Sequence, residues 1–230
     1  MSRVLVFSDT HYPFSIKGYE DFLYEVYKKY HCDTVVHCGD LVDFHALSSH
    51  PTEPDAKDPE TELDWAITCA KRLYKKFKKV HLVLGNHDQR VLRAGAAAKL
   101  TPRMLVPFRE LLHIPRYWKI ADEFIIDDVL YIHGEGYSGL NAHRTVAMTE
   151  GMSTVIGHLH SHAGIAYLAN KNSLIWGMNV GCGIDRKTYG MRYGKNFKYK
   201  PTIGCGVVID GKQPSYIPMD LGSKVIRVKR

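Results

Sequence analysis

Short apolar runs alternate with stretches of helical spacing over the first 88 residues, and no other feature of the sequence constrains the fold as strongly. We expect strands at residues 3–7, 33–37 and 80–84, separated by helices at residues 18–30 and 61–77. Strands that alternate with helices pair in a parallel sheet with right-handed crossovers. The sequence therefore predicts an α/β fold built on a parallel sheet.

The second half of the chain is richer in strands. After a short helix at residues 89–98, residues 101–117 contain three prolines and are expected to be irregular, with a helix at 104–112 as an alternative. The other predicted elements are a hairpin of residues 123–127 and 129–133, a helix at 141–150, and strands at 154–156, 165–168, 173–176, 203–209 and 215–219. Because no internal repeat or flexible linker is visible, we predict one domain, residues 1–230, to which each half contributes a sheet.

Five of the predicted strands end in residue types that bind metal ions: Asp9 and His11; Asp40; Asn86 and His87; His133; His158 and His160. Open α/β sheets place their ligands at the carboxyl ends of strands. A lone histidine is usually a core or surface residue, and Gly85-Asn86-His87-Asp88 alone could be a polar turn with Asp88 as the N-cap of the next helix. Five such strand ends together predict a metal site, and their mixed oxygen and nitrogen donors favour Mn, Fe or Zn over Ca or Mg.

Taken in order, these strand ends resemble the five sequence blocks of the calcineurin-like metallophosphoesterases: Asp9-x-His11, Gly39-Asp40-x-x-Asp43, Gly85-Asn86-His87-Asp88, His133-Gly134 and Gly157-His158-x-His160. The resemblance extends from residue 3 to about residue 183 and includes every block in the family's order. The region that follows is similar to compact phage-encoded members. The fold implied by this resemblance is a four-layer α/β/β/α sandwich of two mixed β-sheets flanked by helices.

The resemblance also implies a role for each residue of the five blocks. Two divalent ions are expected, with Mn²⁺ first and Fe, Zn, Ni or Mg as alternatives, and their ligands would be Asp9, His11 and His160 on one ion, Asn86, His133 and His158 on the other, and Asp40 on both. His87 would contact the phosphate and protonate the leaving oxygen, and Asp43 would orient it. A hydroxide bound by both ions would attack phosphorus. The implied activity is metal-dependent hydrolysis of a phosphoester.

Two features of the sequence that differ from the family's pattern help to predict the type of phosphoester. Asp43 is followed by Phe44-His45-Ala46, whereas serine/threonine phosphatases of this superfamily have Arg-Gly there, and this difference disfavours a protein phosphatase. His45 is similar in placement to a histidine of superfamily nucleases, at a different offset; a surface histidine in a long polar connection is an equal alternative. His45 is therefore a candidate substrate contact.

The other feature is a basic, aromatic segment at residues 186–200, which carries six of the 31 Lys and Arg residues and no acid in a chain of net charge +7. Lysines can follow a phosphate backbone while tyrosines stack on bases, so Lys195, Lys198 and Tyr193 are candidate substrate contacts. The alternative is an ordinary basic loop. For the basic run at residues 71–79 we favour a solvated helix face.

These features favour a phosphodiesterase or nuclease that acts on nucleic acid or nucleotides, with a phosphomonoesterase as the second hypothesis. A non-catalytic scaffold of the same fold, like the retromer scaffold subunit, is the least favoured, because this chain keeps His87 and every ligand. The five scattered cysteines predict reduced thiols in the cytoplasm, or the host cytoplasm for a viral protein. No apolar run approaches the roughly 20 residues of a membrane span. The sequence leaves the oligomeric state and protein partners open.

Overall fold

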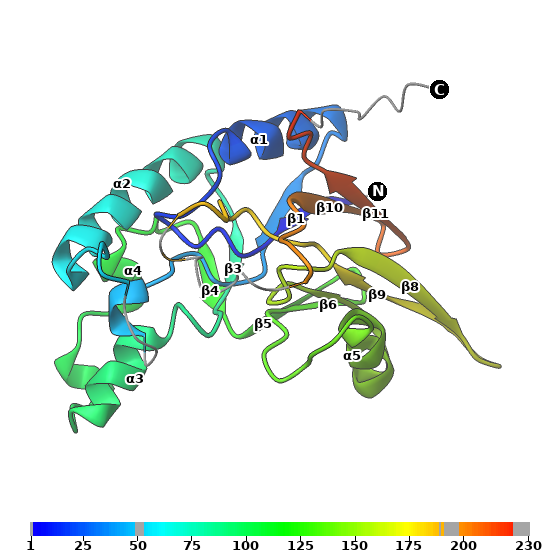
Figure 1. Cartoon of the computed structure of the whole chain (residues 1–230). Helices are drawn as coiled ribbons and strands as arrows, with labels where there is room; N and C mark the ends of the chain where they lie inside the picture. Colours follow the sequence, from blue (N-terminus) through cyan, green and yellow to red (C-terminus); the bar gives the residue numbers. More distant parts are fainter. Residues whose placement is uncertain (1, 49–52, 189, 191–197, 223–230) are drawn as a thin grey trace.

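Two mixed β-sheets packed face to face form the centre of the molecule (Figure 1) in the computed structural model, which describes residues 2–48, 53–188, 190 and 198–222. The first sheet has six strands in the order β11-β10-β1-β2-β3-β4. Its strands are β1 (Arg3–Phe7), β2 (Thr34–His37), β3 (His81–Val83), β4 (Lys119–Ala121), β10 (Gly204–Ile209) and β11 (Gln213–Pro218). Strands β1 to β4 run parallel to one another, and β10 and β11 extend the sheet in antiparallel fashion.

The second sheet has five strands in the order β5-β6-β7-β9-β8. Its strands are β5 (Glu123–Ile126), β6 (Val129–Ile132), β7 (Ser153–Ile156), β8 (Gly164–Ala169) and β9 (Leu174–Asn179). Strands β6, β7 and β9 are parallel, and β5 and β8 are antiparallel edges. The predicted hairpin around Asp127 and Asp128 is confirmed: both residues have positive φ, which is the backbone that a two-residue hairpin turn with matching twist requires.

Helices cover both outer faces of the paired sheets (Figure 1). Helices α1 (Tyr19–Lys29) and α2 (Pro59–Lys76) lie on the six-stranded sheet, and α5 (Ala142–Glu150) lies on the five-stranded sheet. The shorter elements η1 (His45–Leu47), α3 (Arg90–Ala97), η2 (Pro102–Met104) and α4 (Phe108–Leu111) belong to connections. Asp58 caps α2 by accepting hydrogen bonds from the backbone N–H groups of Glu60 and Thr61.

The hydrophobic core is divided into layers by the sheets. Between the sheets, Val6 and Val36 pack with Tyr131, Val155 and Met178, all of them buried. A larger cluster fills the space between the six-stranded sheet and helices α1 and α2, and it includes Phe7, Leu23, Leu73, Leu82 and Trp118. This layering confirms the predicted four-layer α/β/β/α sandwich.

Three details of the second half differ from the sequence-based expectations. The helix proposed for residues 104–112 is wrong in extent, because only Phe108–Leu111 is α-helical and Pro107 immediately precedes it. Strand β4 was not predicted, since its three residues carry no apolar alternation. Strand β9 continues past the predicted residues 173–176, because Gly177 lets the strand pass under α5, where a Cβ would lie 2.6 Å from the carbonyl carbon of His143.

The cysteines and the basic residues of α2 lie as the sequence predicts. All five cysteines are buried free thiols, so no disulfide framework is present. On α2, Arg72 and Lys76 form ion pairs with Glu20 and Asp21 of α1, and Lys71 and Lys75 are exposed, as expected of a solvated basic face. Within the described part of the chain, no helix combines the length and apolar character needed to cross a bilayer.

Candidate metal centre

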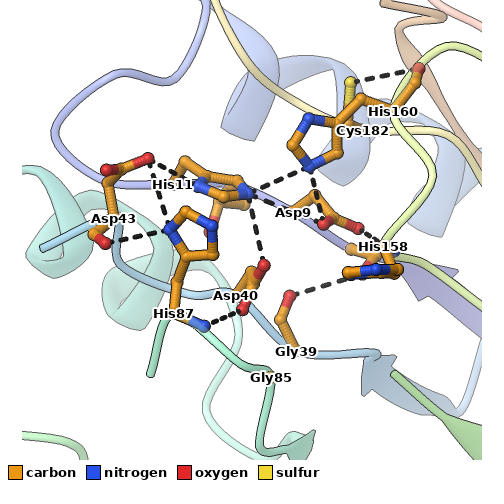
Figure 2. Close-up of polar contacts among 12 residues, drawn as sticks. Asp9, His11, Gly39, Asp40, Asp43, Gly85, His87, His158, His160 and Cys182 are labelled. Carbon is orange, nitrogen blue, oxygen red and sulfur yellow. Dashed lines mark hydrogen bonds and ion pairs between the residues drawn. The ribbon is translucent and has the colours of Figure 1, made fainter. Parts of the chain in front are cut away.

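The five polar strand ends meet in one place because the carboxyl ends of the parallel strands of both sheets lie at the same edge of the molecule. Asp9 and His11 follow β1, Asp40 follows β2, and Asn86 and His87 follow β3; His133 follows β6, and His158 and His160 follow β7. Two hydrogen bonds join the sheets at this point: the backbone N–H of His158 donates to Asp9 Oδ2 at 2.9 Å, and the Nδ1 of His133 lies 2.8 Å from the carbonyl oxygen of Cys38. The site therefore lies across the junction of the two sheets (Figure 2).

A first group of potential ligands consists of Asp9, His11, Asp40 and His160, whose ligand atoms all lie within 4.8 Å of one another. His160 Nε2 is 3.0 Å from Asp9 Oδ1 and 3.1 Å from His11 Nε2. His11 Nε2 also lies 3.5 Å from Asp40 Oδ2. Figure 2 shows these side chains converging on a common point.

A second group consists of Asp40, His133 and His158, again with ligand atoms within 4.8 Å. His133 Nε2 lies 3.3 Å from Asp40 Oδ2 and 3.2 Å from His158 Nδ1. The side-chain oxygen of Asn86 is 2.9 Å from the same His133 nitrogen, so Asn86 belongs to this group as well. Asp40 is the one residue that the two groups share.

A third group places Asp43 between His11 and His87. The Asp43 carboxylate is 2.7 Å from His11 Nδ1 but 3.6 Å from His87 Nδ1. His87 Nδ1 is instead 3.0 Å from the backbone carbonyl oxygen of Asp43. The closer partner of the carboxylate is therefore His11, and the orientation of the His87 ring comes from the backbone of Asp43.

Four of the candidate ligand residues have a strained backbone conformation, which the sequence pattern does not predict. Asp9, His11, Asp40 and His158 all have φ between 44° and 67°, a left-handed conformation that is uncommon for residues other than glycine. The neighbouring Gly39, at φ 93°, lets the turn after β2 lie close to His133, because a Cβ at this position would lie 2.7 Å from His133 Nδ1. The strand ends thus bend sharply enough to point their side chains inward.

The electrostatics of the site are those of buried carboxylates surrounded by histidines. Burial alone would lower the pKa of His11, but hydrogen bonds to Asp43 and Asp9 and the charge of Asp40 raise it to about 10. For His133, burial again acts to lower the pKa, and the charge of Asp40 is the main influence that raises it to about 10. Because cations are attracted to the same carboxylates as these protons, metal binding at this site would release protons.

The sequence model of the calcineurin-like phosphoesterases matches residues 2–176 of the 230-residue chain, a region that contains all five blocks. The chain belongs to this family. Members of the family bind divalent metal ions, and the two ligand groups around Asp40 are the candidate site in this chain. A search of curated proteins finds no significant match.

The solved structures to which this chain is similar include proteins of different kinds. A Vps29 variant from Entamoeba histolytica is 12% identical, with a TM-score of 0.43 and coverage of 95% of this chain and 99% of that one. The phosphoesterase YfcE from E. coli is 16% identical, with a TM-score of 0.46 and coverage of 90% and 88%. The nuclease MPE from Pseudomonas putida is 12% identical, with a TM-score of 0.40 and coverage of 90% and 84%. At these identities the likenesses say nothing about the substrate of this family member.

Asp88, the last residue of the third block, does not have the N-cap role that was the alternative interpretation of the Gly85–Asp88 turn. It is not an N-cap, since Gln89 occupies that position of α3. Its buried carboxylate accepts hydrogen bonds from the backbone N–H groups of Gly85 and Asp40, both at 2.9 Å, and of Val42 at 3.2 Å. Burial and the charge of Asp40 raise its pKa to about 7. Asp88 therefore ties the turn after β3 to the turn after β2, which holds Asp40.

Two of the four candidate substrate contacts, His45 and Lys198, lie in the described part of the chain. His45 begins η1 beside Asp43, and its ring packs edge-on against Phe14 at 6.3 Å. The backbone N–H of His45 donates to Glu62 of α2 at 2.6 Å. Lys198 lies with its ammonium 5.6 Å from the ring centroid of Tyr199. Tyr193 and Lys195 lie outside the described residues.

Arg90 is a residue of the site that sequence reasoning missed. It is the first residue of α3, and its guanidinium contacts Asp43, Phe44 and His87. Its position three residues after His87, on a helix that starts just after the third block, is the sequence signal that could have identified it.

Proposed function

We propose that this family member hydrolyses phosphoesters at a dinuclear metal centre, and that its substrate is a phosphodiester in nucleic acid or a nucleotide. The observation that carries the first part is the position of Asp40, which belongs to both ligand groups. A carboxylate shared by two cations reduces their mutual repulsion. Asp9, His11 and His160 would complete one site, and Asn86, His133 and His158 the other.

The donor set fits divalent first-row metals. Imidazole nitrogens combined with carboxylate and amide oxygens suit borderline ions, so Mn²⁺ is our first expectation, with Fe, Zn, Ni and Mg as alternatives. When bound, such ions supply a nucleophile at neutral pH and neutralise negative charge on the phosphoryl group. Asp43 would support this site through His11, because its carboxylate fixes the far ring nitrogen of that ligand at 2.7 Å.

His87 would be the general acid of the reaction. A carbonyl oxygen only accepts hydrogen bonds, so the contact between His87 Nδ1 and the Asp43 carbonyl requires a hydrogen on Nδ1. Nε2 is then the atom that faces the leaving oxygen. In this structure it accepts from Arg90 Nη2 at 3.3 Å, and burial lowers the pKa of His87 to about 4, so Nε2 would take up its proton only once metal and substrate are bound. Protonation of the leaving oxygen by His87 would convert a poor leaving group, an alkoxide, into an alcohol.

The case for a nucleic-acid substrate depends on residues 186–200. Two contacts near the C-terminal end of this segment support the proposal: the Tyr199 ring is 5.4 Å from that of His162, and the backbone N–H of Thr202, just after the segment, donates to the carbonyl of His160 at 2.7 Å. At the other end, the Asp185 backbone N–H donates to the carbonyl of Phe14 at 2.7 Å. A bound strand that reached His160 would therefore pass close to Tyr199 and Thr202.

Replacing Lys195, Lys198 and Lys200 with alanine is expected to flatten the salt dependence of single-stranded DNA binding. Each lysine that contacts a phosphate releases counterions on binding, so each lost contact lowers the log–log slope by up to about 0.7. The measurement is fluorescence anisotropy of a labelled oligonucleotide across a series of salt concentrations. The matched control removes three exposed lysines elsewhere, Lys71, Lys75 and Lys78. An unchanged slope in the first variant, or an equal change in both, would remove the support for this segment as the binding site.

The proposed activity itself is tested with bis-p-nitrophenyl phosphate and added Mn²⁺, with excess EDTA as the control. Turnover that EDTA abolishes would support the hydrolase. No turnover with Mn²⁺, Fe, Zn, Ni or Mg would favour the scaffold hypothesis. A panel of single-stranded DNA, duplex DNA, RNA, cyclic nucleotides and phosphomonoesters then separates the substrate classes. Clear preference for a phosphomonoester would favour the second hypothesis, a phosphomonoesterase.

A further inference from the structure

The Arg90 side chain lies between the segment that follows β2 and His87. This side chain is only 15% exposed, and its Nη1 donates to the backbone carbonyl of Asp43 at 2.8 Å and to that of Phe44 at 3.2 Å. The same nitrogen forms an ion pair with Asp43 Oδ1 at 3.2 Å. One side of the guanidinium is therefore fixed by the segment that follows β2, and the side chain has already lost most of its rotamer freedom.

The other side of the guanidinium faces the candidate general acid. Arg90 Nη2 lies 3.3 Å from His87 Nε2, the nitrogen that remains after Nδ1 donates to the Asp43 carbonyl. A guanidinium has five N–H groups in a planar fork. Among the described residues, no protein acceptor is paired with the Nε–H or with the second hydrogen of Nη2. These donors lie beside the atom that would protonate the leaving oxygen.

A mostly buried guanidinium with unpaired donors next to His87 is suited to a phosphoryl oxygen, because Arg recognises phosphate with parallel N–H groups. The segment that it contacts includes Phe44, where serine/threonine phosphatases of the superfamily have an arginine. The absence of arginine after Asp43 therefore does not leave this site without a guanidinium, since one arrives from α3 instead.

We propose that Arg90 binds a non-bridging oxygen of the substrate's phosphoryl group beside His87 and thereby decides how well the site accepts phosphomonoesters. This inference rests on the proposed function, since it assumes that a phosphoryl group is bound at the metal centre. A monoester carries one more negative charge than a diester, so a guanidinium at this position favours the monoester more strongly. Arg90 is then a substrate-binding residue that sets the balance between the two classes.

The first test measures binding and needs no turnover. Mn²⁺-loaded protein is titrated with inorganic phosphate in a calorimeter, using wild type, Arg90→Lys, Arg90→Ala and the control Arg103→Ala, which removes an exposed arginine of η2. Lysine can keep the charge and the contacts to the Asp43 and Phe44 carbonyls, but it cannot extend a fork to a phosphate as well. We expect both Arg90 variants to bind phosphate roughly 10- to 100-fold more weakly, the loss of one charge-assisted hydrogen bond, and the control to match wild type.

The second test compares p-nitrophenyl phosphate with bis-p-nitrophenyl phosphate. In Arg90→Lys, kcat/KM for the monoester should fall at least tenfold more than that for the diester, with unchanged metal content. Wild-type phosphate affinity in Arg90→Lys, equal losses on both esters, or no phosphate binding by the loaded wild type would overturn the inference. Wild type that binds phosphate but hydrolyses neither ester would defeat the proposed function, and the phosphate titration would still decide the role of Arg90.

Discussion

Replacing Asp40 with asparagine is expected to abolish metal loading at both sites. Asp40 Oδ2 lies 3.5 Å from His11 Nε2 and 3.3 Å from His133 Nε2, so one carboxylate serves both ligand groups. Asparagine is neutral and offers one oxygen, which cannot share charge between two cations. Elemental analysis after loading with Mn²⁺ and desalting should find well under one ion per chain in the variant.

The design allows loss of metal to be separated from loss of fold. Asp40 Oδ1 accepts the backbone N–H of His87 at 2.7 Å, and the asparagine oxygen can keep that hydrogen bond. A denaturant titration in the presence of EDTA should therefore show a folded variant. The matched control is Asp58→Asn, which exchanges the same groups at the exposed cap of α2, where asparagine caps as well as aspartate. Full occupancy of both sites in the Asp40 variant would disprove the shared role of this carboxylate.

His87→Asn should leave the metal content near wild type while the rate on a dinucleotide falls by roughly 10²–10⁴, the usual contribution of one general acid. The asparagine amide can still donate to the Asp43 carbonyl, which fixes His87 Nδ1 at 3.0 Å in the wild type. The loss should shrink on bis-p-nitrophenyl phosphate, because p-nitrophenolate leaves without a proton.

Two results with this variant would contradict the general-acid role of His87. His87, His11 and Asp43 also form a group that could bind a metal, so a drop in metal content of His87→Asn would assign His87 to the metal rather than to the leaving group. Equal losses on dinucleotide and p-nitrophenyl substrates would likewise contradict the general-acid role. The control is His113→Asn, an exposed histidine at φ 53°, a conformation that asparagine tolerates.

The regular part of the fold could be predicted because hydrophobic periodicity records which face of each element is buried. Helix α1 carries such a pattern, and β1 and β7 are short apolar runs, so the strand ends at Asp9 and His158 could be read directly from the sequence. Strand β4 could not, because three residues of Lys119–Ala121 are stabilised by pairing with β3 rather than by their own pattern.

The details of the centre could not be predicted because they depend on how connections from different strands fold against one another. Asp88 accepts hydrogen bonds from a turn 46 to 48 positions earlier in the chain, and Arg90 contacts carbonyl groups equally remote. The left-handed backbone of Asp40 likewise follows from packing of the turns after β2 and β3. Residue types at strand ends identified the ligands, whereas their supporting partners required the structure.

The position of bound manganese tests the dinuclear centre most directly. Crystals grown with Mn²⁺ would be measured near the manganese absorption edge, and anomalous difference maps would locate the ions without reference to the protein chain. We expect two peaks, one among Asp9, His11 and His160 and the other among Asn86, His133 and His158, with the Asp40 carboxylate adjacent to both. A single peak, or a peak enclosed by His11, Asp43 and His87, would contradict this centre.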